Sequence, residues 1–386
     1  MYGGGGSYCA SVNDQIRPCR DNVAGSKSTL SQSGLRQEND AFGKNTVEQL
    51  VQRLPNRAGS ASMVNQPSIA GTRRSDTPSD YTPAMAPIVP PGSVVYGLQL
   101  PVQAQSTYFV EPWERDAGPA EIAEVARAAD RSGFFYVGVC DHVAIPAELS
   151  PRMGAIWYDT IATLAWIAAQ TTTTRLLSTV YNLTYRHPLV AAKAFATLDL
   201  LSAGRAIIGV GVGHVEKEFV ALGADYANRG RVSDDALQLL DVALRDGRVD
   251  GMDIEPRAVQ QPRPPLWVGG SAPPAVRRAA RLADGWLPQG TPLAELPPLI
   301  ELYRRERGDD TGDIGAITEW LYVGSPTWDL GRPATTGTPE QIAAALHAWT
   351  DTGVNHLQVR FASRSAGELV DQVSAFGEHV GPLLSA

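Results

Sequence analysis

From about residue 94 to its end, the chain alternates between short apolar runs and longer segments with apolar residues at helical spacing. Short apolar runs bounded by turn residues predict buried strands, and apolar residues repeated every three or four positions predict amphipathic helices. Eight strand-like runs occur, and a helical segment follows each of them. The predicted strands are residues 94–100, 134–139, 175–183, 206–212, 266–269, 285–287, 317–323 and 356–361.

Helix-start signals support this alternation. Pro119 follows Gly118 at the first position of a predicted helix, where its missing N–H group costs no hydrogen bond. The pattern Thr-Pro-Glu-Gln that begins at Thr338 is a capping box. Ser271 is placed to cap the helix that follows it. These signals put helix starts in the gaps between the predicted strands.

The number and order of these units predict the fold class. Eight strand–helix units in about 290 residues are typical of a (β/α)8 TIM barrel. An open Rossmann sheet would usually carry Gly-x-Gly-x-x-Gly after its first strand and an acidic residue after its second. Here Gly209, Gly211 and Gly213 belong to the fourth unit. The sequence therefore favours the barrel.

The region before the barrel has a different composition. Residues 1–92 are rich in Gly, Ser, Asn, Gln and Pro and contain few aromatic residues. Such a segment buries too little apolar surface to offset the entropy lost on ordering, so we expect a disordered low-complexity extension. It ends in a proline-rich linker at residues 87–92. The predicted domains are thus the extension, residues 1–92, and the barrel, residues 93–386.

Charge and cysteine content exclude several classes of partner. The net charge of −8 argues against nucleic acid and anionic membranes, because phosphate groups select basic surfaces. No apolar run is long enough to cross a bilayer, and the start of the chain lacks the pattern of a signal peptide. Cys9, Cys19 and Cys140 form neither a disulfide framework nor a zinc pattern. We expect a cytoplasmic protein with a small-molecule substrate; a homodimer is allowed but not required.

The glycine-rich fourth strand is a candidate ligand site. Glycine lacks a Cβ atom, so a planar ring or a phosphate could approach the backbone closely at Gly209, Gly211 and Gly213. Glycine also marks bulges and barrel corners, and the pattern alone leaves both explanations open. In a barrel, the active site lies at the C-terminal ends of the strands. This rule selects Gln99, Asp141, His142, Asn182, residues 209–214, Glu218, residues 269–271 and Gln289.

Further short motifs follow one another through the barrel region. They are Asp141-His142; Tyr185-Arg186-His187-Pro188; Ala194-Phe195-Ala196-Thr197-Leu198-Asp199; Gly204-Arg205; Gly209-Val210-Gly211-Val212-Gly213; Glu218-Phe219; Leu222-Gly223; Arg229-Gly230; Pro265-Leu266-Trp267-Val268-Gly269-Gly270; Ala283-Asp284-Gly285-Trp286; and Gly337-Thr338-Pro339-Glu340-Gln341. With these motifs, residues 94–384 resemble the luciferase-like monooxygenase superfamily, and within it the branch that uses the deazaflavin coenzyme F-420.

The resemblance implies a cofactor site at the barrel mouth. Residues 269–271 match the turn that holds the cofactor's phosphate tail, and free N–H groups at a helix start favour an anion there. Close packing of the helix is the alternative explanation for these glycines. Residues 180–182 match a place where such proteins often carry a backbone bulge beneath the ring. The cofactor-binding residues implied are Val180, Tyr181, Asn182, Gly211, Gly213, His214, Gly269, Gly270 and Ser271.

His142 and Asp141 are the catalytic candidates. A histidine titrates near neutral pH and can donate or accept the proton that accompanies hydride transfer. Asp141 matches a residue near the ring in deazaflavin-dependent relatives. A satisfied polar pair at a strand end is the alternative. Glu218 fits a helix N-terminal charge or a structural anchor better than a base, and we expect no metal site.

His214 departs from one pattern within the superfamily. Sugar-phosphate dehydrogenases of this group carry glutamate directly after the glycine turn, so histidine there argues against a sugar phosphate. The resemblance implies an oxidoreductase that transfers a hydride between coenzyme F-420 and a small organic substrate. The alternatives are a monooxygenase that uses reduced FMN and oxygen, and a barrel that binds a flavin without turnover.

Overall fold

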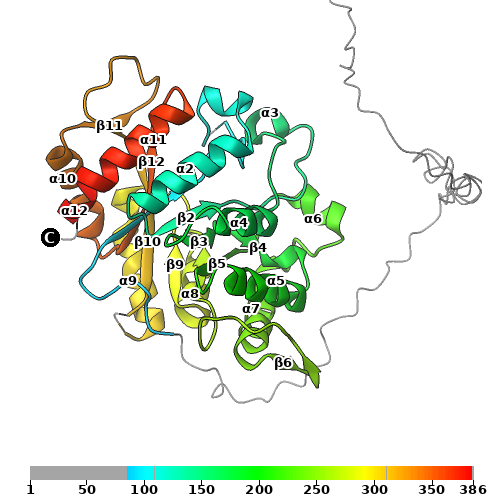
Figure 1. The fold of residues 1–386 in the computed structure, drawn as a ribbon. Helices are drawn as coiled ribbons and strands as arrows, with labels where there is room; N and C mark the ends of the chain where they lie inside the picture. The colour runs from blue at the N-terminus through cyan, green and yellow to red at the C-terminus, as the bar shows by residue number, and fades with distance from the viewer. Residues whose placement is uncertain (1–84, 108, 310, 385–386) are drawn as a thin grey trace, which may run out of the picture. The chain divides into compact units, whose positions relative to one another are not determined.

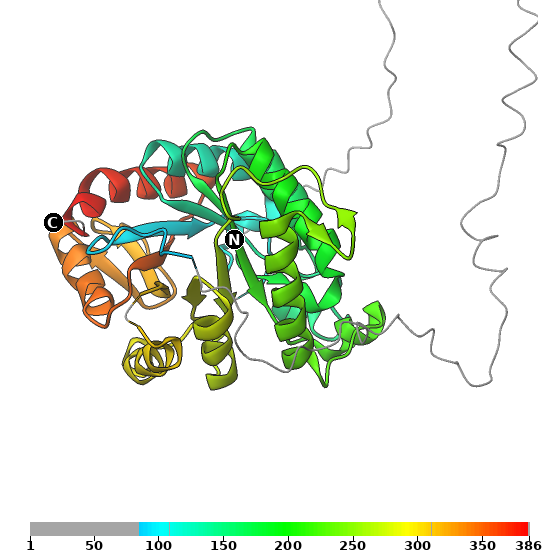
Figure 2. The same ribbon diagram turned by 90° about the horizontal axis from the view of Figure 1, so that it is seen from below.

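The computed structural model describes residues 85–107, 109–309 and 311–384, and its strands form a closed parallel barrel (Figures 1 and 2). Going round the ring, the strand order is β10, β12, β1, β2, β3, β5, β8 and β9, and β9 pairs with β10 to close it. The predicted (β/α)8 barrel is confirmed. The ring strands are β1 (Val95–Gln99), β2 (Tyr136–Val139), β3 (Arg175–Ser178), β5 (Ala206–Gly211), β8 (Leu266–Gly269), β9 (Gly285–Leu287), β10 (Asp313–Val323) and β12 (His356–Phe361).

Helices follow the ring strands and surround them (Figure 2). They are α2 (Pro119–Arg131), α4 (Thr160–Ala168), α5 (Pro188–Leu201), α6 (Glu216–Leu222), α7 (Arg229–Asp246), α8 (Pro273–Leu282), α9 (Leu296–Arg307), α10 (Pro339–Thr350) and α11 (Ala366–Ala375). Smaller elements are η1 (Pro112–Asp116), α3 (Ser150–Met153), β4 (Tyr181–Asn182), η2 (Leu183–Tyr185), β6 (Arg248–Val249), β7 (Met252–Asp253), η3 (Leu293–Glu295), β11 (Ala334–Gly337), the π-helical turn η4 (Phe376–Val380) and α12 (Gly381–Leu384). Among the described residues, no helix has the length and apolar character needed to cross a membrane.

The helix-start signals are confirmed at two of the three sites. The Thr338 side chain accepts a hydrogen bond from the Gln341 N–H group, and the Gln341 side chain accepts one from the Thr338 N–H group. Pro119 occupies the first position of α2. The prediction that Ser271 caps the next helix is wrong, because α8 begins one residue later and its N-cap is Ala272.

Aromatic side chains fill the N-terminal end of the barrel. Alternate residues of a strand point to the same side, and the inward positions near the strand starts carry a buried cluster. His356 of β12 stacks on Trp267 with ring centroids 4.3 Å apart, and Tyr136 meets Trp267 edge-on at 6.0 Å. Leu177, Ile207 and Leu287 belong to the same buried cluster. The N-terminal end of the lumen is therefore filled, and the C-terminal ends of the strands are the side at which a barrel binds ligands.

The segment before β1 closes the N-terminal end through buried carboxylates. The Asp313 carboxylate accepts hydrogen bonds from the N–H groups of Ile88 and Val89, both at 3.1 Å, and from Trp267. The N–H group of Met85 donates to Asp284 at 2.7 Å. These contacts precede residue 93, where the sequence predicts that the barrel begins. Most of the predicted extension, residues 1–84, lies outside the described residues.

Asp313 should make stability depend on pH. Burial raises the pKa of Asp313 to about 6 from an ordinary value of 3.8, and the hydrogen bonds from Ile88 and Val89 offset only part of this rise. Between these pH values the folded protein holds a proton that the unfolded chain has released. The contribution of Asp313 to the free energy of unfolding is therefore fully present below about pH 4 and is lost as the pH rises through 6.

We expect Asp313→Asn to remove this decline, which is on the order of 2 kcal/mol between pH 4 and 7. Urea unfolding of both proteins across this range measures it. Asp371→Asn, on the exposed face of α11, serves as the control. Equal pH slopes in the wild type and Asp313→Asn would show that Asp313 does not carry the effect.

Candidate active site

The third strand is interrupted at the mouth of the barrel. β3 ends at Ser178, the Thr179–Val180 peptide bond is cis, and the chain resumes as β4 beside the end of β5. The resemblance implies a bulge at residues 180–182, and the interruption, at residues 179–180, overlaps only the start of that range. Ser178 bridges the gap, because its hydroxyl donates to the Gly209 carbonyl at 2.8 Å and accepts from the Gly209 N–H group at 3.0 Å.

The strand glycines make room for this interruption. A Cβ atom on Gly211 would lie 2.5 Å from Cγ2 of Val180, and one on Gly269 would lie 2.7 Å from its Cγ1. A Cβ atom on Gly209 would collide with the Ser178 carbonyl oxygen. The space beside these glycines therefore holds the chain's own bulge. A ligand at the mouth would meet the half-buried Val180 side chain before it met the glycine backbone.

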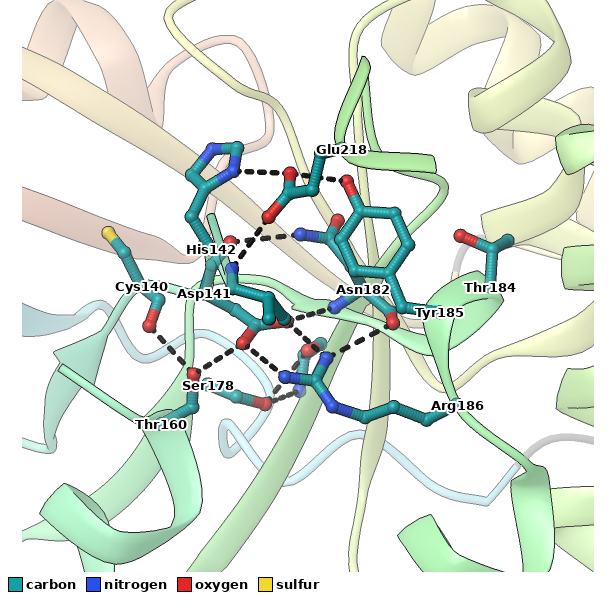
Figure 3. A network of polar contacts seen from close by, with 12 residues as sticks. Cys140, Asp141, His142, Thr160, Ser178, Asn182, Thr184, Tyr185, Arg186 and Glu218 are labelled. Carbon is teal, nitrogen blue, oxygen red and sulfur yellow. Dashed lines mark hydrogen bonds and ion pairs between the residues drawn. The ribbon is translucent and has the colours of Figure 1, made fainter. Parts of the chain in front are cut away.

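Asp141 is the centre of a buried polar network (Figure 3). Its Oδ2 atom accepts hydrogen bonds from the Asn182 N–H group and from Arg186, each at 2.7 Å. Its Oδ1 atom accepts from Arg186 at 2.9 Å and from the Thr160 hydroxyl at 3.1 Å. The Asn182 amide also donates to the Asp141 carbonyl at 2.9 Å. Four donors satisfy the carboxylate, and it joins the end of β2 to β4, α4 and the segment before α5.

Arg186 is fixed by the same network. It forms a bidentate ion pair with Asp141, and its guanidinium lies 4.2 Å from the centre of the Tyr181 ring. Burial opposes the charge of Arg186, but the hydrogen bonds and charge of Asp141 outweigh it and raise the arginine pKa. The Tyr181 ring also packs against Phe195 of α5, so this side chain lies between the barrel and α5.

Glu218 of α6 holds His142. The Nδ1 atom of His142 and the Oε2 atom of Glu218 are 2.8 Å apart, and the Tyr185 hydroxyl donates to the same oxygen at 2.8 Å (Figure 3). The other oxygen accepts from the N–H groups of Val143 and Ala144 at 2.6 and 3.1 Å. Burial opposes ionisation of Glu218, but these hydrogen bonds outweigh it and hold its pKa at about 2.

The ring of His142 is packed on two sides and has one nitrogen left for a ligand. Trp157 meets it edge-on at 4.5 Å between ring centroids, and His214 does so at 5.3 Å. Burial lowers the pKa of His214, and the nearby His142 lowers it further. Nδ1 of His142 is taken by Glu218, and no residue in the described ranges hydrogen-bonds to its Nε2. The site therefore presents a carboxylate-anchored imidazole.

The turn before α8 offers fewer N–H groups than the sequence suggests. Gly270 has φ +121°, and its N–H group donates to the Leu287 carbonyl. The first two residues of α8, Pro273 and Pro274, have no N–H group. Within the described residues, the N–H groups of Ser271 and Ala272 have no partner. An anion at this turn would rely on those two donors.

The predicted residues fall into three groups. Hydrogen bonds join Asp141 directly to Asn182, and His142 follows Asp141 in the chain and contacts His214. Val180, Gly211 and Gly269 form the interrupted wall, and residues 269–271 lie at the end of β8. Gly213 instead lies beside Phe219 and Tyr185, and Tyr181 packs towards α5. The sequence did not indicate that Trp157 packs against the histidine or that Tyr185 binds the carboxylate that holds it, although Tyr185 stands in one of the quoted motifs.

A family model described as luciferase-like monooxygenase matches residues 100–322. The sequence is 26% identical over 279 residues to 5,10-methylenetetrahydromethanopterin reductase of Methanopyrus kandleri, with 60% of this chain and 76% of the relative covered. It is 32% identical over 188 residues to the F-420-dependent glucose-6-phosphate dehydrogenase of Nakamurella multipartita, with 44% and 52% covered.

A solved structure gives the same fold. The oxygenating constituent of 3,6-diketocamphane monooxygenase from the CAM plasmid of Pseudomonas putida, in complex with FMN, superimposes with a TM-score of 0.59. The match covers 75% of this chain and 98% of that chain at 14% sequence identity, which supports the fold alone. The family model matches more than half of the chain, over the segment that contains the interrupted strand and the anchored histidine. The chain belongs to the luciferase-like monooxygenase family.

Proposed function

We propose that this protein is an oxidoreductase that transfers a hydride between coenzyme F-420 and a small organic substrate at the barrel mouth. The observation that carries the proposal is the His142 imidazole, which Glu218 holds through Nδ1 while its Nε2 has no partner in the described part of the chain. A relative named as an F-420-dependent glucose-6-phosphate dehydrogenase supports this cofactor class.

The residues at the mouth fit a flavin-like group. Val180 gives the interrupted wall an apolar, partly exposed surface that suits the face of a planar ring. The N–H groups of Ser271 and Ala272 suit a phosphate. Gly213 has φ +71° beside His214, in the turn that we propose flanks the cofactor. When bound, coenzyme F-420 supplies the hydride chemistry.

His142 is assigned the proton. Hydride addition to a carbonyl carbon leaves an oxygen that must take up a proton, and the reverse reaction must release one. Nε2 of His142 donates or accepts that proton. The ionised Glu218 stabilises the imidazolium and fixes the ring orientation through Nδ1.

Asp141 is better suited to positioning than to proton transfer. Both of its oxygens are bound by Arg186, so neither oxygen is free to contact a ligand. Its bonds to Thr160 and Asn182 fix the strand end from which His142 projects. We therefore propose that Asp141 orders the site and that His142 exchanges the proton.

An FMN-dependent monooxygenase is the second candidate. One observation favours it, because the diketocamphane monooxygenase structure of the same fold contains FMN. The apolar surface of Val180 would suit an FMN ring equally well. Binding of a flavin without turnover is the third candidate.

Side-by-side titration with F-420 and FMN separates these candidates. We expect the purified protein to quench deazaflavin fluorescence with saturation and to bind FMN at least roughly tenfold more weakly. Oxygen consumption with reduced FMN measures the second candidate. Preferential FMN binding together with oxygen consumption would replace the proposal with the monooxygenase.

His142→Ala should lower turnover by roughly 10²–10⁴-fold and leave cofactor affinity within a few-fold of the wild type, because it removes only the proton donor or acceptor. Single-turnover kinetics and the fluorescence titration measure the two effects. His214→Ala is the matched comparison, and we expect it to weaken cofactor binding more than turnover. An unchanged rate in His142→Ala would exclude this residue from the mechanism.

Glu218→Gln should lower turnover. A neutral amide stabilises an imidazolium less than a carboxylate does, so the step in which His142 carries the proton should slow. Tyr185→Phe removes one hydrogen bond to Glu218 without changing its charge, and we expect a smaller loss of rate. Single-turnover kinetics measure both variants, and wild-type rates with reduced stability would show that Glu218 is only a structural anchor.

A further inference from the structure

A second polar cluster lies in the lumen, away from His142, at the ends of β10 and β12. The alternation along β12 places His356 inward, against Trp267, and Val359 and Phe361 outward in the core beneath the helices. Arg360 shares the face of His356, so it points into the barrel near the C-terminal end of its strand. This is the end at which barrel enzymes bind substrate.

A β-bulge supplies the partners of Arg360. The register of β10 against β12 shifts between Ile317 and Trp320, and Trp320 then pairs with Arg360. Such a bulge redirects side chains and frees backbone groups. The freed Thr318 carbonyl accepts hydrogen bonds from Nε and Nη2 of Arg360 at 3.2 and 2.8 Å. Glu319 turns outward and accepts from Trp349 of α10.

Two guanidinium groups share the Trp320 ring. The guanidinium carbon of Arg332 lies 4.1 Å from the ring centre, and that of Arg360 lies 5.5 Å from it. Burial lowers the pKa of Arg360, and the positive charge of Arg332 lowers it further. The two cations are therefore held close together although they repel one another.

The acidic groups near these arginines are bound to other residues, and Glu319, whose charge partly opposes the lowering of the Arg360 pKa, accepts a hydrogen bond from Trp349. Arg332 pairs with the buried Glu111 at 3.1 Å. The Glu114 carboxylate accepts from the N–H groups of Val102 and Glu111, and burial raises its pKa to about 7. No carboxylate in the described ranges lies within ion-pair distance of Arg360. Three of its five N–H groups remain available after those given to Thr318.

We propose that Arg360, with Arg332 and Trp320, binds an oxoanion of the substrate, namely a carboxylate, sulfonate or phosphate. An anion there would supply the missing charge and receive charge-assisted hydrogen bonds. The inference rests on the proposed function, in which the substrate occupies the lumen beside His142. β12 is two strands from β2, so the anionic group would lie about 10 Å from the strand that carries His142.

The cofactor's phosphate tail is a second source of the same chemistry, and the topology favours the substrate. The turn proposed for the tail follows β8, and the shorter path round the ring from β12 to β8 passes β10 and β9. This separation is three strands in a ring of eight, close to the opposite side of the lumen. Arg360 and Ser271 therefore face the mouth from different sectors of the barrel.

The test measures binding and needs no turnover. Cinnamate, 4-phenylbutanoate and hexanoate, each with its methyl ester, are titrated calorimetrically into the full-length protein, with and without F-420. We expect at least one acid to bind roughly tenfold or more tightly than its ester. Arg360→Met should abolish this preference, and Arg360→Lys should keep part of it.

Arg175→Met is the matched control. Arg175 is also half-buried on an aromatic ring, that of Phe135, but lies at the N-terminal start of β3. We expect it to keep the preference for the acid, and circular dichroism checks that each variant is folded. Equal affinity for acids and esters, or no binding of any acid, would overturn the inference. So would an acid preference that survives in Arg360→Met.

Titration of Arg360→Met with F-420 identifies the source of the anion. If Arg360→Met binds F-420 with wild-type affinity, the anion belongs to the substrate. If this variant binds F-420 more weakly and binds the acids as the wild type does, the arginine holds the cofactor tail and the inference is overturned. If the wild type binds neither F-420 nor FMN but retains an acid preference that depends on Arg360, the proposed function fails while the oxoanion site stands.

Discussion

The interrupted third strand is the constraint on which the rest of the site depends. A strand in the middle of a parallel barrel cannot bend without leaving backbone groups unpaired, and each buried group needs a new partner. Ser178 bonds both backbone groups of Gly209, and the Thr179 N–H group donates to the Val139 carbonyl. The Asn182 N–H group takes the Asp141 carboxylate as its acceptor. The interruption therefore requires glycines on β5 and β8, and the Asp141 carboxylate at the end of β2.

Asp141 and Glu218, the two carboxylates at the mouth, suit different roles because they bind different partners. Asp141 pairs with a guanidinium, and removing either partner would leave an unpaired buried charge. Glu218 instead accepts from neutral donors and from an imidazole whose charge can change. The first arrangement suits a fixed element of structure. The arrangement around Glu218 suits a site in which the His142 ring exchanges a proton through Nε2.

The sequence predicted the positions of the eight strands and the edge of the barrel at which the polar residues meet. Periodicity and turn residues are local signals, and most barrel strands follow them, although β10 begins four residues before the predicted 317 and the predicted strand 175–183 is divided into β3 and β4. The role of the strand glycines could not be predicted in the same way, because it depends on the residue that lies opposite them in the barrel. Val180 belongs to another strand, and no local pattern shows that its side chain fills the space beside Gly211 and Gly269. The same limit applies to Tyr181, whose ring packs towards α5 because of Phe195 and Arg186.

Some features of the site that differ from the sequence prediction can be recognised in the sequence itself. Pro273 and Pro274 remove N–H groups from the start of α8, which weakens the case for an anion at that turn. The sequence indicates that Glu218 is an anchor, and it does not show what Glu218 anchors. Its partner His142 lies 76 residues away in sequence, and only the closed barrel brings the two together. Arg360 was not singled out at all. Its inward orientation follows from two-residue alternation once His356 is known to face the lumen.

The division of the lumen follows from that same alternation. Inward positions near the strand starts carry Tyr136, Trp267 and His356, which pack into a buried layer. Two or four residues further along the same strands, the inward positions become Gly138, Gly269 and Arg360. Large rings at the base thus give way to small or charged residues at the mouth. The sector of β2, β5 and β8 gains space for the interrupted strand, while that of β10 and β12 gains a guanidinium that has no ion-pair partner in the described ranges. A ligand that spans the mouth would therefore meet an apolar wall on one side and a guanidinium on the other.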